Sequence, residues 1–132
     1  LLLVIAQRLV HTLCKKCKEG YHPTREEFDL LVEEYGTEKF SSLGIKYKDS
    51  LMLKRPVGCK KCEETGLAGR TGLYEILEGT PELKSLVMKG ATVEELRKQA
   101  ISDGMTTLKQ DGIQKVFKGE CDLKHVNAVC LL

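Results

Sequence analysis

The sequence predicts an α+β fold, mainly helical, in which a tetracysteine zinc-binding insertion is followed by a C-terminal helical bundle with short strands. One observation behind this prediction is that the motif Cys-Lys-Lys-Cys occurs twice, at residues 14–17 and 59–62. Paired thiols two residues apart, used twice, are the ligand set of a four-cysteine zinc site. The other is that three helical segments downstream are each followed by a glycine, at Gly90, Gly104 and Gly119.

The two cysteine pairs predict a structural metal site rather than a catalytic one. Four thiolates fill the tetrahedron around zinc and leave no position for an activated water, whereas a hydrolytic zinc uses three protein ligands. His11 and His22 flank the first pair and could replace a thiolate, and the pairs could instead be unrelated reduced or redox-active thiols. No thioredoxin-like βαβ pattern surrounds either pair. The candidate zinc ligands are therefore Cys14, Cys17, Cys59 and Cys62.

The charge balance argues against a nucleic-acid binder. The 132 residues carry a net charge of +2, and three Phe, four Tyr and no Trp leave few side chains for base stacking. A zinc ion held by four thiolates is itself negatively charged, so lysines beside it have a local electrostatic role without any outside partner. These lysines are Lys15, Lys16, Lys18, Lys60 and Lys61. No stretch reaches the apolar length of a membrane span.

The first half of the chain contains one well-marked helix. Residues 1–13 are largely apolar, and periodicity alone leaves open whether they form a buried strand or a helix. Thr24 opens a capping box, which predicts a helix that stops at Gly36. The mixed composition of residues 37–50 is typical of a loop, and residues 51–55 are predicted to form a short strand.

A glycine-rich segment follows the second cysteine pair. Residues 66–72 contain three glycines and predict a sharp reversal that leads into a strand at 73–77. The segment is not a phosphate-binding loop, because it lacks the pattern Gly-x-x-x-x-Gly-Lys-Ser/Thr and neither follows a strand nor opens a helix. Arg70 on this turn could reach a neighbouring subunit or an acidic partner.

Three further helices are predicted, with a short fourth one at the C-terminal end. Thr80, which precedes a proline, and Thr92, which opens a capping box, are helix N-terminal signals. Cys121 and Cys130 remain after the tetrad and are expected to be reduced, half-buried side chains rather than a disulfide. The predicted helices span residues 81–89, 92–104, 107–118 and, for the short one, 122–129.

Five motifs then follow one another in a distinctive order and spacing. They are Ala6-Gln7-Arg8-Leu9-Val10, Leu13-Cys14-x-x-Cys17, Pro56-Val57-Gly58-Cys59-x-x-Cys62-x-x-Thr65-Gly66, Gly69-Arg70-Thr71-Gly72-x-Tyr74-Glu75-Ile76-Leu77, and Gly104-Met105-x-x-Leu108-x-x-Asp111-Gly112. In this order they resemble the C-terminal end of the type II secretion and type IV pilus assembly ATPases, over essentially the whole chain. Cys121, where a Thr or Ser cap is expected, and the tail at 126–132 depart from the family pattern.

The resemblance implies a division of the chain into three parts. Residues 1–13 would be the end of a segment of the ATPase core, and residues 14–66 would be the tetracysteine zinc-binding insertion. Residues 67–132 would form a strand and a C-terminal helical subdomain. The first and last parts would together be the far end of a RecA-like ATPase core.

The resemblance also implies a function that this chain serves only as part of a longer protein. The chain would be the C-terminal zinc-binding fragment of a hexameric cytoplasmic ATPase, peripheral to the bacterial inner membrane, that powers type II secretion or type IV pilus extension. Its partners would be the rest of the ATPase, neighbouring subunits of the homohexamer and inner-membrane platform proteins, with an anionic membrane surface as a further candidate. ATP and Mg²⁺ would bind only in the full-length parent, because no P-loop lysine or catalytic carboxylate occurs here.

A free-standing zinc module that binds nucleic acid or an adaptor protein is the alternative hypothesis. In that case the lysines of the two cysteine pairs would form a phosphate-binding patch. The glutamate-rich helix after Thr24 argues against it. The chain begins without Met in an apolar run and is therefore expected to be a fragment, and a Walker A motif upstream would decide for the ATPase.

Overall fold

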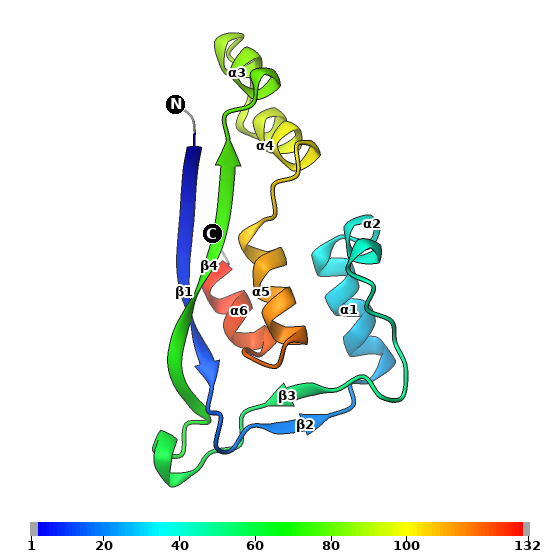
Figure 1. Ribbon diagram of the computed structural model, residues 1–132, viewed down its shortest axis with the longest axis vertical. Helices are drawn as coiled ribbons and strands as arrows, with labels where there is room; N and C mark the ends of the chain where they lie inside the picture. Colours follow the sequence, from blue (N-terminus) through cyan, green and yellow to red (C-terminus); the bar gives the residue numbers. More distant parts are fainter. Residues whose placement is uncertain (1–2, 131–132) are drawn as a thin grey trace.

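A long two-stranded antiparallel ladder runs along the molecule and is the element against which the two C-terminal helices pack (Figure 1). The computed structural model describes residues 3–130, so the first two and the last two residues of the predicted segments 1–13 and 67–132 lie outside the described residues. Strand β1 (Leu3–Leu13) pairs with β4 (Leu67–Glu78), in a register that runs from Leu3 opposite Glu78 to Leu13 opposite Leu67. The segment that periodicity left open is thus a strand, because β4 supplies its hydrogen-bond partners.

One face of this ladder is covered by the two C-terminal helices. Val10 on β1 and Leu73 on β4 are buried beneath α5 (Leu108–Phe117) and α6 (Leu123–Cys130). Side chains alternate between the faces of a strand, and on the opposite face Ile5 and Leu9 remain 57% and 50% exposed. The α+β class is confirmed, but at 11 and 12 residues the two main strands are not short as predicted.

Helices α5 and α6 approach each other closely at a glycine. Thr107 and Gln110 form a reciprocal capping box at the start of α5, in which the hydroxyl accepts from the N–H of Gln110 and the amide oxygen accepts from that of Thr107. Gly112 then leaves room for Val126 of α6, which is fully buried. The sequence predicted both helices but gave no sign of this contact.

The segment between the cysteine pairs folds into a short ladder and a helical pair. Strand β2 (Glu19–Tyr21) pairs with β3 (Leu53–Arg55), and α1 (Arg25–Tyr35) lies between them in the chain. As predicted, the Thr24 hydroxyl caps α1 by accepting from the N–H of Glu27. The Glu27 carboxylate does not close the capping box, because it accepts a hydrogen bond from the Tyr21 hydroxyl instead.

Two local predictions were wrong. The region 37–50, predicted to be a loop, begins with α2 (Thr37–Phe40) and a 3-10 turn at Ser41–Leu43. The reason is tertiary, since Phe40 is 4% exposed and its ring packs against that of Tyr35 at a centroid distance of 5.8 Å. The predicted turn at 66–72 lies almost wholly within β4, and the chain reverses earlier, where Glu63 and Glu64 have positive φ angles of 57° and 65°.

The helical pair of this segment shares a hydrophobic core with the C-terminal helices. The rings of Phe28 and Phe40 pack against Phe117 of α5 at centroid distances of 6.1 and 5.5 Å. The Gln114 amide of α5 donates to the Tyr35 hydroxyl at 2.9 Å. Figure 1 shows α1 and α2 standing beside α5, with β2 and β3 bridging the base. Residues 14–66 are therefore packed onto the rest of the chain and not only tethered to it.

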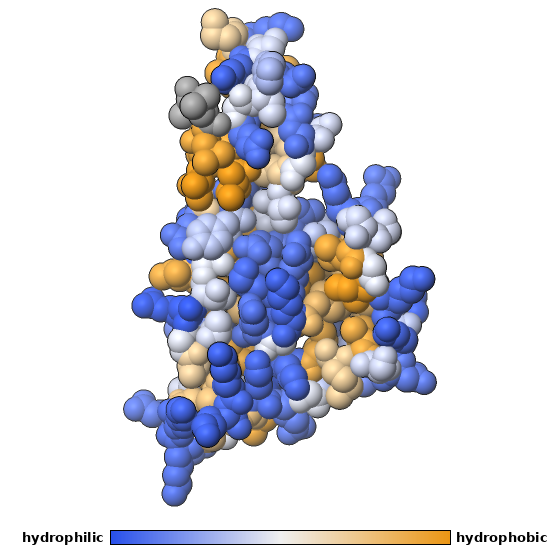
Figure 2. Space-filling model, viewed as in Figure 1, coloured by the Kyte–Doolittle hydropathy of each residue, from blue (hydrophilic) through white to orange (hydrophobic). Residues whose placement is uncertain are grey.

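Helices α3 (Pro81–Met88) and α4 (Val93–Ser102) lie at the C-terminal end of β4, away from β2 and β3. Thr80 and Thr92 cap them as predicted, each accepting from the backbone N–H three residues ahead. Met88 and Val93 are 87% and 82% exposed. Figure 2 shows apolar side chains gathered where this end of the ladder meets α3. Among residues 3–130, no helix combines the length and the hydrophobicity that crossing a bilayer requires.

We predict that Gly112→Ala destabilises the protein. A Cβ at this position would lie 2.4 Å from Cγ1 of Val126 and 3.3 Å from Cδ1 of Leu73. Overpacking of this kind costs about 1–3 kcal/mol, more than the roughly 1 kcal/mol that alanine gains over glycine in a helix. Urea unfolding measures the change. In a Val126→Ala background the cost should largely disappear, and a stabilised Gly112→Ala variant would contradict the packing described here.

Candidate metal centre

Four cysteine sulfurs converge where β1 ends and β4 begins. The Sγ atoms of Cys14, Cys17, Cys59 and Cys62 all lie within 4.8 Å of one another. Three of the separations are 3.8 Å for Cys14 to Cys59, 3.8 Å for Cys17 to Cys62 and 3.7 Å for Cys59 to Cys62. The structure thus brings together all four residues predicted as zinc ligands.

The backbone on each side of the cluster fixes the direction of the sulfurs. Cys14 directly follows β1, and its N–H donates to the carbonyl of Gly66 at 2.9 Å. Its own carbonyl accepts from the N–H of Lys18 at 2.9 Å, which closes a tight turn around the first pair. The second pair lies on a 3-10 turn at Lys60–Cys62 that follows the extended residue Cys59. The ends of the segment between the pairs are thereby held against the base of the main ladder.

Backbone N–H groups point at two of the sulfurs. Gly58 donates to Sγ of Cys17 at 3.3 Å, and Cys59 and Gly66 donate to Sγ of Cys62 at 3.2 Å each. Burial opposes ionisation of Cys62, but the two N–H donors, together with the sulfurs of Cys59 and Cys17, outweigh it and lower the pKa of this thiol to about 6. The single donor at Cys17 is outweighed by burial and the neighbouring sulfurs, which raise its pKa to about 11.

The first pair contains a second perturbed thiol. The backbone N–H of Lys16, aided by that of Cys17, lowers the pKa of Cys14 even though burial opposes it. Cys14 is 1% exposed and Cys62 7%, so both sulfurs that favour the thiolate are shielded from solvent. Donors aimed at buried sulfurs are what a metal-binding thiolate requires, because they spread its negative charge without a counter-ion.

The spacing of the sulfurs fits a tetrahedral metal ion. Sulfurs about 2.3 Å from a central zinc stand at the corners of a tetrahedron whose edges are about 3.8 Å. The three separations of 3.7–3.8 Å agree with this length. A disulfide needs about 2.05 Å, and all six cysteines are free thiols. The geometry therefore favours a shared metal ion over disulfide-type pairs.

The histidines that flank the first pair do not join the cluster. Nδ1 of His22 lies 2.9 Å from the carbonyl oxygen of Leu51, and its ring packs on Tyr47. The ring of His11 packs against that of His125 at a centroid distance of 6.4 Å. Within residues 3–130, the group of side chains close enough to share a metal consists of the four cysteines alone.

The lysines near the cluster divide into two kinds. Lys18 is half-buried, and its Nζ donates to the carbonyl of Gly119 at 2.9 Å, in the turn between α5 and α6. The N–H of Leu13 donates to the backbone carbonyl of Glu120, in the same turn, at 2.9 Å. These two contacts tie the cluster to the C-terminal helices. The other four lysines are exposed and form no ion pair among the described residues; they are Lys15, Lys16, Lys60 and Lys61.

The two remaining cysteines lie away from the cluster. Cys121 is fully buried in the core, and burial raises its pKa to about 11. Cys130 is half-buried in the last turn of α6, and burial raises its pKa as well. Both are free thiols of low reactivity. The expected half-burial holds for Cys130 but was wrong for Cys121, which is fully buried.

Sequence reasoning missed the residues that shape the second cysteine pair. Thr65 donates to the carbonyl of Cys62 at 2.7 Å and accepts from the N–H of Leu67 at 3.1 Å. Gly66 has a φ of +77°, and a Cβ there would lie 2.5 Å from Cβ of Pro56. The signal in the sequence is the pattern Cys59-x-x-Cys62-x-x-Thr65-Gly66, in which a hydroxyl side chain and a glycine follow the second pair.

Comparison with known proteins agrees with this architecture. The sequence profile of the family described as Type II/IV secretion system protein matches residues 1–128. The chain belongs to this family.

Relatives come from both secretion and pilus systems. The chain is 37% identical over 129 residues to the type II secretion system ATPase E of Vibrio cholerae, covering 98% of the chain and 23% of the relative. It is 35% identical over 127 residues to the type IV pilus assembly ATPase PilB of Pseudomonas aeruginosa, covering 96% of the chain and 20% of the relative. It is 30% identical over 125 residues to the type IV pilus assembly ATPase PilB of Thermus thermophilus, covering 95% of the chain and 13% of the relative. The chain thus spans about a fifth, or less, of the length of these relatives.

We predict that the metal-free chain binds one zinc ion and releases protons as it does so. At pH 7 the thiol of Cys17 is protonated, with a pKa of about 11, and must lose its proton to bind a metal. Affinity should fall further as the pH approaches 6, where Cys62 also becomes protonated. Calorimetry in buffers of different ionisation enthalpy counts the protons, and elemental analysis counts the metal.

Two cysteine variants distinguish a metal ligand from a cysteine that does not bind the metal. Cys62→Ser should weaken zinc binding by at least about tenfold, whereas Cys130→Ser, which changes a cysteine outside the cluster, should leave it unchanged. A zinc content well below one ion per chain, or equal affinities for the two variants, would show that the four sulfurs do not form the site.

Proposed function

We propose that this chain is the zinc-stabilised C-terminal part of a hexameric cytoplasmic ATPase that powers type II secretion or type IV pilus extension. The observation that carries the proposal is the four-sulfur cluster at the junction of β1 and β4, in a chain that belongs to the secretion family. Relatives named as ATPases of both systems support it. Family membership also favours this function over a free-standing zinc module that binds nucleic acid or an adaptor.

In this proposal the metal is zinc and its role is structural. Four thiolates would complete its coordination and leave no position for a substrate or water. The ligands would be Cys14, Cys17, Cys59 and Cys62, and the N–H groups aimed at their sulfurs would hold them in place. Binding free energy at such a site becomes folding free energy, because the unfolded chain does not preform it.

The chain is proposed to contribute mechanics rather than chemistry to the parent ATPase. ATP and Mg²⁺ would bind in the part of the parent that lies outside this chain. Residues 1–13 and 67–132 would belong to the far end of the RecA-like core, with residues 14–66 as the zinc-binding insertion. Because this insertion is joined to the ladder by the cluster and to α5 by an aromatic core, movements of the core would be transmitted to it as to a rigid body.

The exposed lysines around the cluster are proposed as one docking surface of the insertion. Lys15, Lys16, Lys60 and Lys61 belong to the two pairs that meet at the cluster, and all four point into solvent. Such a surface would be drawn to an acidic face of the inner-membrane platform or to anionic lipid, at about 1 kcal/mol per lysine near a membrane. A peripheral position at the bacterial inner membrane would follow from this contact.

The metal ligands can be tested in the full-length parent. Cys14→Ser combined with Cys59→Ser should abolish zinc binding, destabilise the insertion and stop export of the secreted protein or assembly of pili. Cys130→Ser is the matched control and should support normal export, because this side chain lies outside the cluster. Normal export by a parent that has lost its zinc would refute the structural role proposed for the metal.

The lysine surface needs a test that leaves the metal in place. Replacing Lys15, Lys16, Lys60 and Lys61 by Gln in the full-length parent should preserve zinc content and ATP hydrolysis but reduce export. The control replaces four other exposed lysines, namely Lys46, Lys48, Lys84 and Lys89. Unimpaired export by the first variant would leave its lysines with only the local electrostatic role of offsetting the thiolates.

A further inference from the structure

Among residues 3–130, no strand pairs with the outer edge of β4 near its C-terminal end. The N–H of Tyr74 donates to Oδ2 of Asp111 at 2.9 Å, so it points away from β1. Tyr74 lies opposite Gln7 in the ladder, and this is therefore a pair without mutual hydrogen bonds. Pairs of this kind recur at every second residue, so the N–H groups of Ile76 and Glu78 point to the same outer edge.

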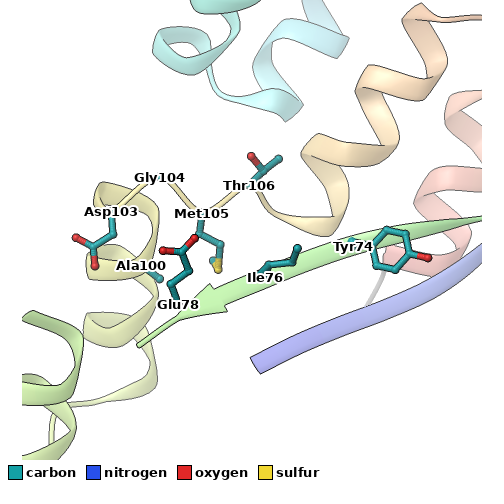
Figure 3. A pocket seen from close by; sticks show the side chains of 8 residues that line it. All are labelled: Tyr74, Ile76, Glu78, Ala100, Asp103, Gly104, Met105 and Thr106. Carbon is teal, nitrogen blue, oxygen red and sulfur yellow. The ribbon is translucent and has the colours of Figure 1, made fainter. Parts of the chain in front are cut away.

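This edge borders a groove. A cavity of about 250 Å³ lies between Tyr74, Ile76 and Glu78 on β4 and the segment 103–106 that connects α4 with α5 (Figure 3). The connecting segment runs alongside β4 without pairing to it, because the N–H groups of Gly104 and Met105 donate back to α4. Within residues 3–130, nothing accepts the N–H of Ile76 or of Glu78.

The side chains around the groove describe the chemistry of what would fit there. Figure 3 shows Met105 and Glu78 directed toward the space between β4 and the connecting segment. Ile76 is 44% exposed, and with Met105 it provides an apolar surface. Glu78 is exposed and forms no ion pair among the described residues, and the Asp103 carboxylate, held by Thr80 and Gln99, adds negative charge at the same end. An apolar edge with an acidic end complements an extended segment that carries a basic residue.

We propose that the outer edge of β4 at Ile76 and Glu78 binds an extended segment of a partner protein as an additional strand, with a Lys or Arg of that segment facing Glu78. Main-chain hydrogen bonds would supply the attachment and the acidic end the selectivity, as in other cases of strand addition. The added strand would be short, because Asp111 already occupies the N–H of Tyr74 and blocks the edge on that side. This interaction is independent of the metal and of the function proposed above.

Amide hydrogen exchange followed by NMR tests the register of the added strand. The probe is an acetylated and amidated hexapeptide of sequence Thr-Lys-Val-Lys-Val-Thr, added to the zinc-bound chain. The amides of Ile76 and Glu78 should gain protection, while those of Leu77, already bonded to β1, and Tyr74, bonded to Asp111, should not change. A peptide in which both lysines are replaced by glutamate should give less protection at the same concentration. Equal binding of the two peptides, or protection elsewhere but not at Ile76 and Glu78, would overturn the proposal.

The same charge reversal is made at two positions, one on β4 as the test and one on α1 as the matched control. Glu78→Lys should weaken binding of the lysine peptide by about two- to fivefold, the range of an exposed ion pair. Glu33→Lys makes the same change at an exposed position on α1, no residue of which lines the groove, and should have no effect. If the amides of Ile76 and Glu78 are protected without any peptide, the edge pairs instead with a second copy or with the segment 103–106, and the proposal fails. Dependence of that protection on chain concentration would tell these two apart.

Discussion

The convergence of four cysteine sulfurs at the point where β1 ends and β4 begins is the constraint on which the arrangement of the chain depends. The two cysteine pairs are separated by a long segment, so bringing them together has a chain-entropy cost that local structure does not offset. The carbonyl of Gly66 accepts from the N–H of Cys14, and the N–H groups of Cys59 and Gly66 donate to Sγ of Cys62. A bound metal would lock this closure, because it adds bonds that exist only when the segment has returned.

A second attachment makes the cysteine-bounded segment part of the main body. Phe28 and Phe40 pack against Phe117 of α5, and the Lys109 ammonium pairs with the Glu34 carboxylate at 3.2 Å. The cluster itself contacts the α5–α6 turn through Lys18. Two separated attachments remove the hinge that a single tether would leave. This is the physical basis for treating the segment as a rigid extension of the ladder that could transmit movement.

The surfaces that remain open suggest how such a body meets its neighbours. The face of the ladder away from α5 and α6 keeps Ile5 and Leu9 half exposed, whereas the end near the cluster carries exposed charged side chains, four lysines together with Glu63 and Glu64. An apolar surface of this kind is suited to stable packing within a larger assembly, and a charged one to contacts that form and break. The outer edge of β4 differs from both, because it would bind a partner through backbone hydrogen bonds.

The sequence by itself determined the local features that depend on few neighbouring residues. These include the metal-binding potential of the doubled Cys-Lys-Lys-Cys, the caps at Thr24, Thr80 and Thr92, and the family, because spacing and capping act within a few residues.

Only the tertiary structure decided features that rest on partners distant in the chain. Periodicity could not show that residues 3–13 are a strand, because its hydrogen bonds go to β4 more than fifty residues later. Residues 37–40 form a helical turn in a region of loop-like composition, because burial of Phe40 against Tyr35 outweighs the weak helix propensity of the local sequence. The same holds for the four sulfurs, whose residue types the sequence supplies but whose separations of 3.7–3.8 Å arise only when both ends of the segment meet.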